Sequence, residues 1–298
     1  MTSSEAMSSL DFHIENNYCW GRGPMKNMKI SKVTPTTAYK YILTTYAERR
    51  RLDWTKRPWI LNEKIDGPDK GEAPEAWQIE IEVPDFFHER TFKTAVPHTE
   101  EEKICETCVG DKRIPCRPCR GRGYTKTNDK RRTCRYCNGY GDITCPECKG
   151  TGRMVHYLQL TVIFQNHEDN FVHEVTDLPD ELILTVNGEE LLSEADKRVG
   201  SIVNFFLDEI NEASSTLTEK HATEWTDEVI HQQRQFLSAV PVFEVSYKLG
   251  NGETGRFWVY GSEKSIFSID YPAQCCCCCI CNSCNNCVCC NDSSCALL

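Results

Sequence analysis

Apolar residues recur along this chain at two different spacings, one typical of helices and one typical of strands. In residues 34–51, the side chains of Tyr39, Ile42, Leu43 and Tyr46 would share one face of a helix. The same spacing predicts two further helices, over residues 202–210 and 225–237. Alternation of apolar and polar residues instead predicts strands, over residues 77–83, 92–96, 155–164, 242–249, 255–261 and 264–270. We therefore expect an α+β fold class, in which helices and an antiparallel sheet form one mixed body.

The patterned segments are interrupted by polar stretches that suggest how the chain is organised. Residues 1–33 are polar and without a regular pattern, so we expect a mobile N-terminus. Residues 63–76 are rich in proline, glycine and charge, which is typical of a linker. Strands are predicted before and after residues 103–153, so this segment is expected to be an extended hairpin inserted into one body. The body would then consist of residues 34–102 and 154–272, followed by a cysteine-rich tail at 273–298.

The inserted segment contains four Cys-x-x-Cys pairs, in CETCVGDKRIPCRPCRGRGYTKTNDKRRTCRYCNGYGDITCPECKGTG. Two residues between the cysteines let one short turn present both sulfur atoms to one ion, as tetrahedral zinc requires. A glycine stands two residues after each pair, where a sharp turn favours a positive φ angle. A redox dithiol is the alternative, but such a motif is a single pair at the start of a helix. The pattern predicts two zinc ions, each bound by four thiolates.

The spacing of the pairs indicates which of them share an ion. The first two pairs start 11 residues apart, as do the last two, and 14 residues separate Cys119 from Cys134. Equal arms around a central turn favour a hairpin that brings the two outer pairs together and the two inner pairs together. The expected zinc ligands are Cys105, Cys108, Cys145 and Cys148 for one ion, and Cys116, Cys119, Cys134 and Cys137 for the other. Pairing between neighbours along the chain stays open as the alternative.

The repeated CxxCxGxG pattern resembles the cysteine-rich zinc finger of DnaJ-type co-chaperones. In that family the outer repeats bind one zinc ion and the inner repeats bind the other. The first repeat, CETCVGDK, departs from the pattern because Lys112 stands where a second glycine is expected. The His-Pro-Asp signature of the family's J domain does not occur in the sequence, so stimulation of an ATP-driven chaperone is not implied. The resemblance implies binding of an unfolded client or another protein partner.

The whole chain is also similar to a small family named for suppression of the uncoordination of stomatin mutants. This resemblance rests on the finger together with two flanking segments, ISKVTPTTAYKYILTTYAERRRLDWTKRPW and GRFWVYGSEKSIFSIDYP. It implies no enzymatic activity.

Composition and charge narrow the classes of function. The 298 residues are 40% hydrophobic and 26% charged, and the net charge of −10 argues against nucleic-acid binding by the whole chain. The N-terminal sequence MTSSEAMSSLDFHIENN lacks the basic and apolar regions of a secretory signal, and no apolar run reaches the length of a membrane span. We expect a cytoplasmic protein whose thiols stay reduced, with the nucleus left open as a second location.

The central part of the finger is strongly basic. Residues 112–135 hold ten lysines or arginines and one acidic residue, Asp129. Each zinc ion with four thiolates carries a net charge of −2, so structural charge compensation explains some of these cations. Charge compensation explains less well the presence of four cations near the expected hairpin tip, which are Lys126, Lys130, Arg131 and Arg132. We expect these four to bind an acidic protein partner, with nucleic acid as the alternative.

The cysteines of the tail suggest covalent attachment of lipid, a third chemistry besides metal binding and disulfide exchange. Eleven of the last 24 residues are cysteine, and the chain ends in Cys295 followed by Ala-Leu-Leu, a prenylation motif that favours geranylgeranyl. One prenyl chain binds membranes only marginally, so palmitoylation of Cys289 and Cys290 is the expected second signal. The tail thus predicts a lipid anchor at a cytosolic membrane face. A metallothionein-like metal sink and an unselected tail are the alternatives.

No enzyme motif is found: the sequence has no GxSxG, P-loop or dinucleotide-binding glycine motif, and its histidines lack metal-site spacing. The sequence therefore predicts a non-enzymatic, zinc-binding, chaperone-like or adaptor protein. The two alternatives are a nucleic-acid-binding zinc protein and a thiol-disulfide oxidoreductase that uses the Cys-x-x-Cys pairs.

Overall fold

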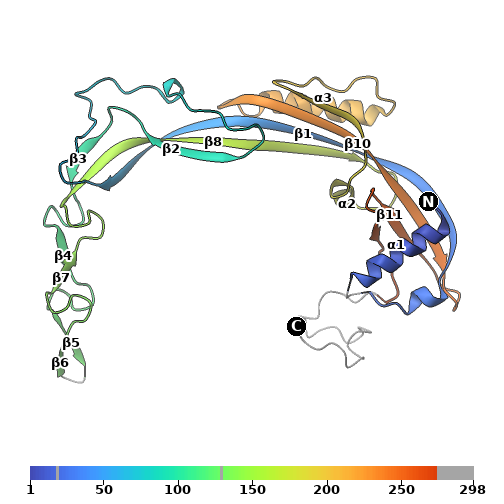
Figure 1. The fold of residues 1–298 in the computed structure, drawn as a ribbon, viewed down its shortest axis with the longest axis horizontal. Helices are drawn as coiled ribbons and strands as arrows, with labels where there is room; N and C mark the ends of the chain where they lie inside the picture. The colour runs from blue at the N-terminus through green and yellow to red at the C-terminus, as the bar shows by residue number, and fades with distance from the viewer. Residues whose placement is uncertain (18–19, 128–129, 274–298) are drawn as a thin grey trace. The chain divides into compact units, whose positions relative to one another are not determined.

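The computed structural model describes residues 1–17, 20–127 and 130–273, and these residues form mainly β-sheet (Figure 1). Of the residues that the structure describes, strands hold 43% and helices 15%, so the expected mixed α+β body is wrong. The strands are β1 (Lys29–Pro58), β2 (Arg90–Ala95), β3 (Glu101–Ile104), β4 (Arg113–Pro115), β5 (Tyr124–Thr127), β6 (Lys130–Thr133), β7 (Asp142–Thr144), β8 (Arg153–His173), β9 (Glu189–Asp196), β10 (Glu228–Lys248), β11 (Thr254–Tyr260) and β12 (Ser265–Phe267). The α-helices are α1 (Ser3–Glu15), α2 (Asp180–Leu184) and α3 (Asp208–Thr223).

One large sheet contains most of these strands. Its order is β12-β11-β10-β1-β8-β2, with β3 also pairing with β8 and β9 with β10. Two small two-stranded sheets, β4-β7 and β5-β6, are separate from it. The chain divides into unit 1 (Met1–Thr45, His167–Thr226 and Gln232–Leu298) and unit 2 (Tyr46–Asn166 and Asp227–His231), and the long strands β1, β8 and β10 contribute residues to both.

In unit 1, helices cover the sheet. Helix α1 buries Ala6, Leu10 and Ile14, which are spaced by one helical turn, in one core cluster with residues of β10 and β11. Its first turn is closed by a capping box between Thr2 and Glu5. Part of the N-terminal segment expected to be mobile, Ser3–Glu15, thus forms a helix that packs in a core cluster of unit 1. None of the described helices has the length and apolar character needed to cross a membrane.

In unit 2, an aromatic and aliphatic core forms on one face of the sheet. Tyr46 of β1 stacks on Phe164 of β8 with ring centroids 6.0 Å apart, and Phe92 of β2 lies opposite Val162 of β8. Residues 76–87 pack against this cluster without forming a strand. The strand expected at 77–83 is thus wrong: a short 3-10 helix, Ala76–Gln78, is followed by an irregular segment.

The helix expected over residues 34–51 is wrong because the segment lies inside β1. Strand β1 runs between β10 and β8, and every residue from 43 to 48 is buried. A central strand covered on both faces loses the alternation of apolar and polar residues. Its threonines and tyrosines are strand-forming residues. Because apolar residues occur on both faces of this strand, Tyr39, Ile42 and Tyr46 matched helical spacing by chance.

The helix expected over residues 225–237 is the start of strand β10. Gln233 and Gln235 are buried on the same strand face as Leu237, so two polar residues occupy core positions. They are satisfied by hydrogen bonds: Gln233 donates to Thr45 Oγ1 (2.9 Å), and Gln235 accepts from the hydroxyl of Tyr41 (2.8 Å). These buried amides conceal the alternation in the sequence.

The third expected helix, at 202–210, is displaced along the chain. Helix α3 begins only at Asp208. The residues before it form a loop because the side chain of Asn211 bonds to both the N–H (3.1 Å) and the carbonyl (2.9 Å) of Phe205.

Candidate metal centres

The finger leaves the large sheet through two paired strands. Strand β3 leads into it and β8 leads out of it, and Ile104 pairs with Arg153 where they diverge. The small sheets β4-β7 and β5-β6 then follow one another along the finger (Figure 1). Four repeats lie along the finger, at residues 105–112, 116–123, 134–141 and 145–152.

The hairpin brings the eight cysteines of these repeats together as two separate tetrads. The outer tetrad is Cys105, Cys108, Cys145 and Cys148, and the inner tetrad is Cys116, Cys119, Cys134 and Cys137. All eight side chains are buried, and within each tetrad the four sulfur atoms lie within 4.8 Å of one another. These are the nested sets expected from the equal arms of the hairpin, rather than sets of neighbouring pairs. Each tetrad offers four ligands to one metal ion.

The sulfur atoms are spaced as ligands and not as disulfides. Sulfurs on facing repeats are 3.9 Å apart for Cys105 and Cys145 and 3.7 Å for Cys108 and Cys148. In the inner tetrad the corresponding distances are 3.8 Å and 3.7 Å. A disulfide would need about 2.05 Å. All eight cysteines are free.

The turn that presents each cysteine pair depends on left-handed backbone. In every repeat the residue after the second cysteine and the glycine that follows it both have positive φ, as in Asn138 (49°) and Gly139 (88°). The second glycine also lies against the facing repeat. A Cβ atom at Gly123 would stand 2.3 Å from the carbonyl oxygen of Gly139. Glycine is required there by both conformation and space.

Backbone hydrogen bonds repeat in the same way across both tetrads. In the inner tetrad, the N–H of Cys116 donates to the carbonyl of Gly141, and the N–H of Cys134 donates to that of Gly123, both at 2.8 Å. In the outer tetrad, the N–H of Cys105 donates to the carbonyl of Gly152 at 2.9 Å. The fourth such bond, at 2.9 Å, runs from the N–H of Cys145 to the carbonyl of Lys112. Lys112 thus fills the backbone role of the missing glycine.

Lys112 performs this role in a strained conformation, with a φ of 65°. Left-handed backbone costs a non-glycine residue roughly 1–2 kcal/mol, and glycine loses roughly 0.5–1 kcal/mol more chain entropy on folding. We therefore expect Lys112→Gly to stabilise the finger by about 0.5 kcal/mol. The measurement is the denaturant midpoint of the finger at fixed metal concentration. Lys103→Gly, in the extended strand β3, is the matched control and should destabilise; equal destabilisation by both changes would contradict the argument.

The electrostatics of the tetrads favour a bound cation. Burial raises the pKa of the Cys116 thiol to about 12, whereas a backbone hydrogen bond from Cys137 lowers the pKa of Cys134 to about 7. The N–H groups of Gly123 and Gly141 also donate to the sulfurs of Cys119 (3.3 Å) and Cys137 (3.2 Å). Four thiolates so close together repel one another, so a divalent cation is what allows all four to be ionised at once.

A side-chain contact that sequence reasoning missed anchors the outer tetrad to strand β1. Glu147, between Cys145 and Cys148, accepts from the hydroxyl of Thr107 in the first repeat and pairs with Lys56 Nζ at 2.5 Å. The hydrogen bond between Lys56 and Glu147 raises the pKa of Lys56. Nothing in the spacing of these residues along the sequence signals the contact, because β1 and the fourth repeat are brought together only by the fold.

The remaining predicted site residues fall in two places. Lys126 lies on β5, and Lys130, Arg131 and Arg132 lie on β6, where all four are exposed. The cysteines expected to carry lipid, Cys289, Cys290 and Cys295, lie outside the residues that the structure describes.

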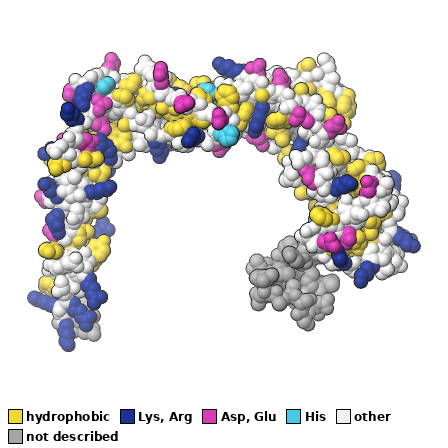
Figure 2. All heavy atoms as spheres, viewed as in Figure 1, with side chains coloured by type: hydrophobic (Ala, Val, Ile, Leu, Met, Phe, Trp, Pro, Cys, Tyr) yellow, Lys and Arg dark blue, Asp and Glu magenta, His cyan; other side chains and the backbone are white. Residues whose placement is uncertain are grey.

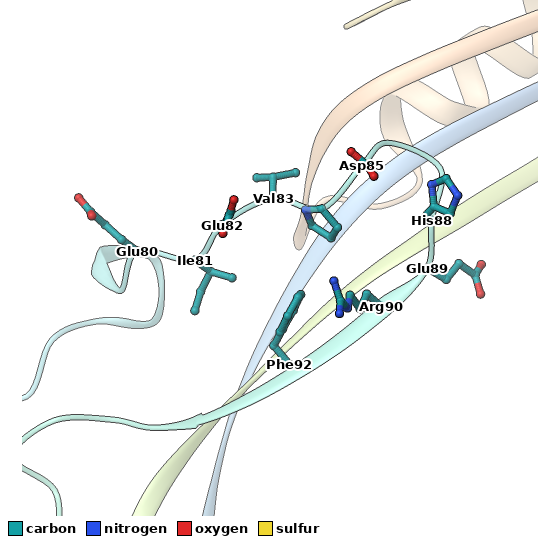
Figure 3. Close-up of a pocket in the computed structure, with 10 residues that line it drawn as sticks. Glu80, Ile81, Glu82, Val83, Asp85, His88, Glu89, Arg90 and Phe92 are labelled. Atoms are coloured by element: carbon teal, nitrogen blue, oxygen red, sulfur yellow. The ribbon is translucent and has the colours of Figure 1, made fainter.

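A groove of about 720 Å³ lies in unit 2 between the irregular segment after Gln78 and strand β2 (Figure 3). Ile81 and Phe92 line it together with carboxylates that include Glu80, Glu82 and Glu89. Its lining also includes one histidine and one arginine, but no serine, threonine, cysteine, lysine or tyrosine.

Known relatives match the chain over most of its length. It is 30% identical over 301 residues to "Protein SSUH2 homolog" from Homo sapiens, covering 93% of this chain and 79% of that protein. The protein of the same name from Danio rerio is 28% identical, with 93% and 82% covered, and the one from Mus musculus is 31% identical over 266 residues, with 81% and 77% covered. No family model matches the chain, and no solved structure matches it. Because the match to the human protein spans the finger and both flanks, this chain belongs to the SSUH2 family.

Proposed function

We propose that this protein is a non-enzymatic, two-zinc, chaperone-like adaptor that binds protein partners or unfolded clients through its finger. The observation that carries the proposal is the pair of buried cysteine tetrads. A tetrahedral site with metal–sulfur bonds of about 2.3 Å, the value for zinc, has sulfur–sulfur edges of about 3.8 Å. The facing sulfurs are 3.7–3.9 Å apart.

The geometry supports a structural role for both ions. Each tetrad supplies four protein ligands, which leaves no position open for water or substrate. The same arrangement argues against a thiol-disulfide oxidoreductase, because cysteines held as metal ligands are not free to form a disulfide. The finger's resemblance to the DnaJ-type module agrees with a scaffold that presents a surface.

The surface of the finger supports binding to polypeptide. Three large side chains on its repeats are strongly exposed: Val109 (78%), Tyr136 (67%) and Tyr140 (79%). Exposed tyrosines provide large contact area at low cost in side-chain entropy, and they are enriched in protein interfaces. We propose that this binding takes place in the cytoplasm, at the cytosolic face of a membrane to which lipid on the cysteine-rich tail anchors the protein.

Proximity labelling in cells tests the proposal. The intact chain, fused to a labelling enzyme, is compared with Cys116→Ser/Cys119→Ser, which removes two ligands of the inner tetrad. We expect the double substitution to remove most labelled partners, because the finger surface needs its metal. Cys19→Ser, which lies outside both cysteine clusters, is the control and should keep the partner set. An identical partner set for all three proteins, at equal abundance, would rule out a finger-dependent adaptor.

A further inference from the structure

We propose that the β5-β6 hairpin is a docking site for an acidic polypeptide segment that adds to it as an extended strand. This inference rests on the proposed function and names the chemistry of the partner. Lysine and arginine side chains gather at this end of the finger (Figure 2). Lys126, Lys130, Arg131 and Arg132 are exposed there, and within the described residues none of them forms an ion pair. By contrast, Arg113, further back on the finger, pairs with Asp142 at 2.7 Å.

The hairpin places like charges directly across from each other. Lys126 of β5 pairs in register with Arg131 of β6. Like charges at opposed positions destabilise a two-stranded sheet, so folding alone does not favour this pair. Since side chains alternate along a strand, Lys126 and Arg131 share one face, and Lys130 and Arg132 share the other. Both faces of the hairpin are therefore positive.

The backbone of the hairpin is also open to a partner. Strands β5 and β6 form a sheet of their own, so within the described residues each has only one neighbouring strand. An outer edge of this kind accepts an extended peptide through main-chain hydrogen bonds. A peptide strand rich in Asp and Glu beside β6 would direct carboxylates to both faces, toward Arg131 on one and toward Lys130 and Arg132 on the other. A peptide can contact both faces while its main chain pairs with the strand edge, whereas a nucleic acid has no amide backbone for that pairing.

Two further observations favour a peptide over RNA. Each strand has four residues, which is about 13 Å of extended chain, so it matches a short acidic run but spans few phosphates. The ring of Tyr124 already makes cation–π contacts with the guanidinium groups of Arg131 (4.7 Å) and Arg122 (5.8 Å), and these contacts compete with stacking of a base on this ring.

The inner tetrad holds this docking site in shape. Cys134 directly follows β6, and its N–H donates to the carbonyl of Gly123, directly before β5, at 2.8 Å. The metal site therefore closes the base of the hairpin. Partner binding should depend on the inner ion more than on the outer one.

The test measures binding of a fluorescent octaglutamate peptide to the full-length zinc-loaded protein by anisotropy. We expect salt-sensitive binding that Lys126→Glu weakens about tenfold. This substitution replaces a like-charge pair with an opposite-charge pair across the hairpin, so it leaves the hairpin at least as stable and separates binding from folding. Lys29→Glu, an exposed lysine of unit 1, is the control of equal charge change and should have little effect.

The outcomes separate this inference from its rivals. Absence of octaglutamate binding, or equal loss from Lys126→Glu and Lys29→Glu, overturns the docking site. Binding of single-stranded oligouridine at least as tight as octaglutamate, and equally reduced by Lys126→Glu, also overturns it in favour of nucleic acid. If octaglutamate fails while proximity labelling still depends on Cys116 and Cys119, the adaptor function stands and only the acidic partner is wrong.

Discussion

Chelation of zinc is expected to release two ions per chain and to unfold the finger while the large sheet stays folded. The finger has almost no apolar core of its own: its two buried clusters consist of the cysteine side chains, with Met154, Ile114 and Ile143 beside them. Metal binding must therefore supply most of its folding free energy, on the order of 10–16 kcal/mol per structural zinc site. The measurements are metal content by mass spectrometry and amide hydrogen exchange with and without chelator.

Single ligand substitutions sharpen this test. Cys137→Ser and Cys145→Ser each remove one ligand, from the inner and the outer tetrad respectively. We expect each protein to lose tight binding of one ion and to keep the other. Acid should act like the chelator, because the thiolates must stay deprotonated to hold the metal. One ion per chain, or finger amides that stay protected in chelator, would falsify the two-zinc proposal.

Arg50→Ala is expected to lower the free energy of unfolding by about 3–5 kcal/mol, because it removes the arginine paired with the buried Glu48 carboxylate and leaves that carboxylate only its contact with His231 Nε2 at 2.8 Å. Arg50 Nε lies 2.5 Å from Glu48, and the two side chains are only 7% and 4% exposed. The guanidinium also donates to the carbonyls of Ala76 (2.5 Å) and Ile79 (2.8 Å) and lies over the ring of Trp77. The segment that lines the groove should therefore loosen together with the core.

The neighbouring residue provides a matched control for this change. Arg51 pairs with Asp53 at 2.6 Å, but these side chains are 65% and 50% exposed. Exposed pairs contribute about 0–1 kcal/mol, so Arg51→Ala should be nearly neutral. Denaturant unfolding measures both changes, and limited proteolysis measures access to residues 76–79. Equal effects of the two substitutions would show that the buried pair has no special role in stability.

The finger and the body differed in how far the sequence could predict them. The finger's ligands lie in short repeats, and each turn is specified by residues next to the cysteines it presents, so local spacing was sufficient to predict both tetrads. In the body, the contacts that decide the structure join distant segments. Gln235 can lie in the core because its amide accepts from Tyr41 and donates to Glu194 and to the carbonyl of Gly200. Glu48 can be buried because Arg50 and His231 both contact it. Polar residues at these buried positions interrupt the alternation of apolar and polar residues from which a strand is predicted.

The nested arrangement of the tetrads has a consequence for the order in which the finger assembles. The facing cysteines of the inner tetrad are 18 residues apart along the chain, and those of the outer tetrad are 40 apart. Closing the longer loop first costs about 0.7 kcal/mol more in chain entropy. Once the inner ion is bound, only two short arms separate the outer cysteines from one another. The finger is therefore expected to fold from its tip toward the sheet, with the inner ion bound first. It should lose its outer ion first when the metal concentration falls.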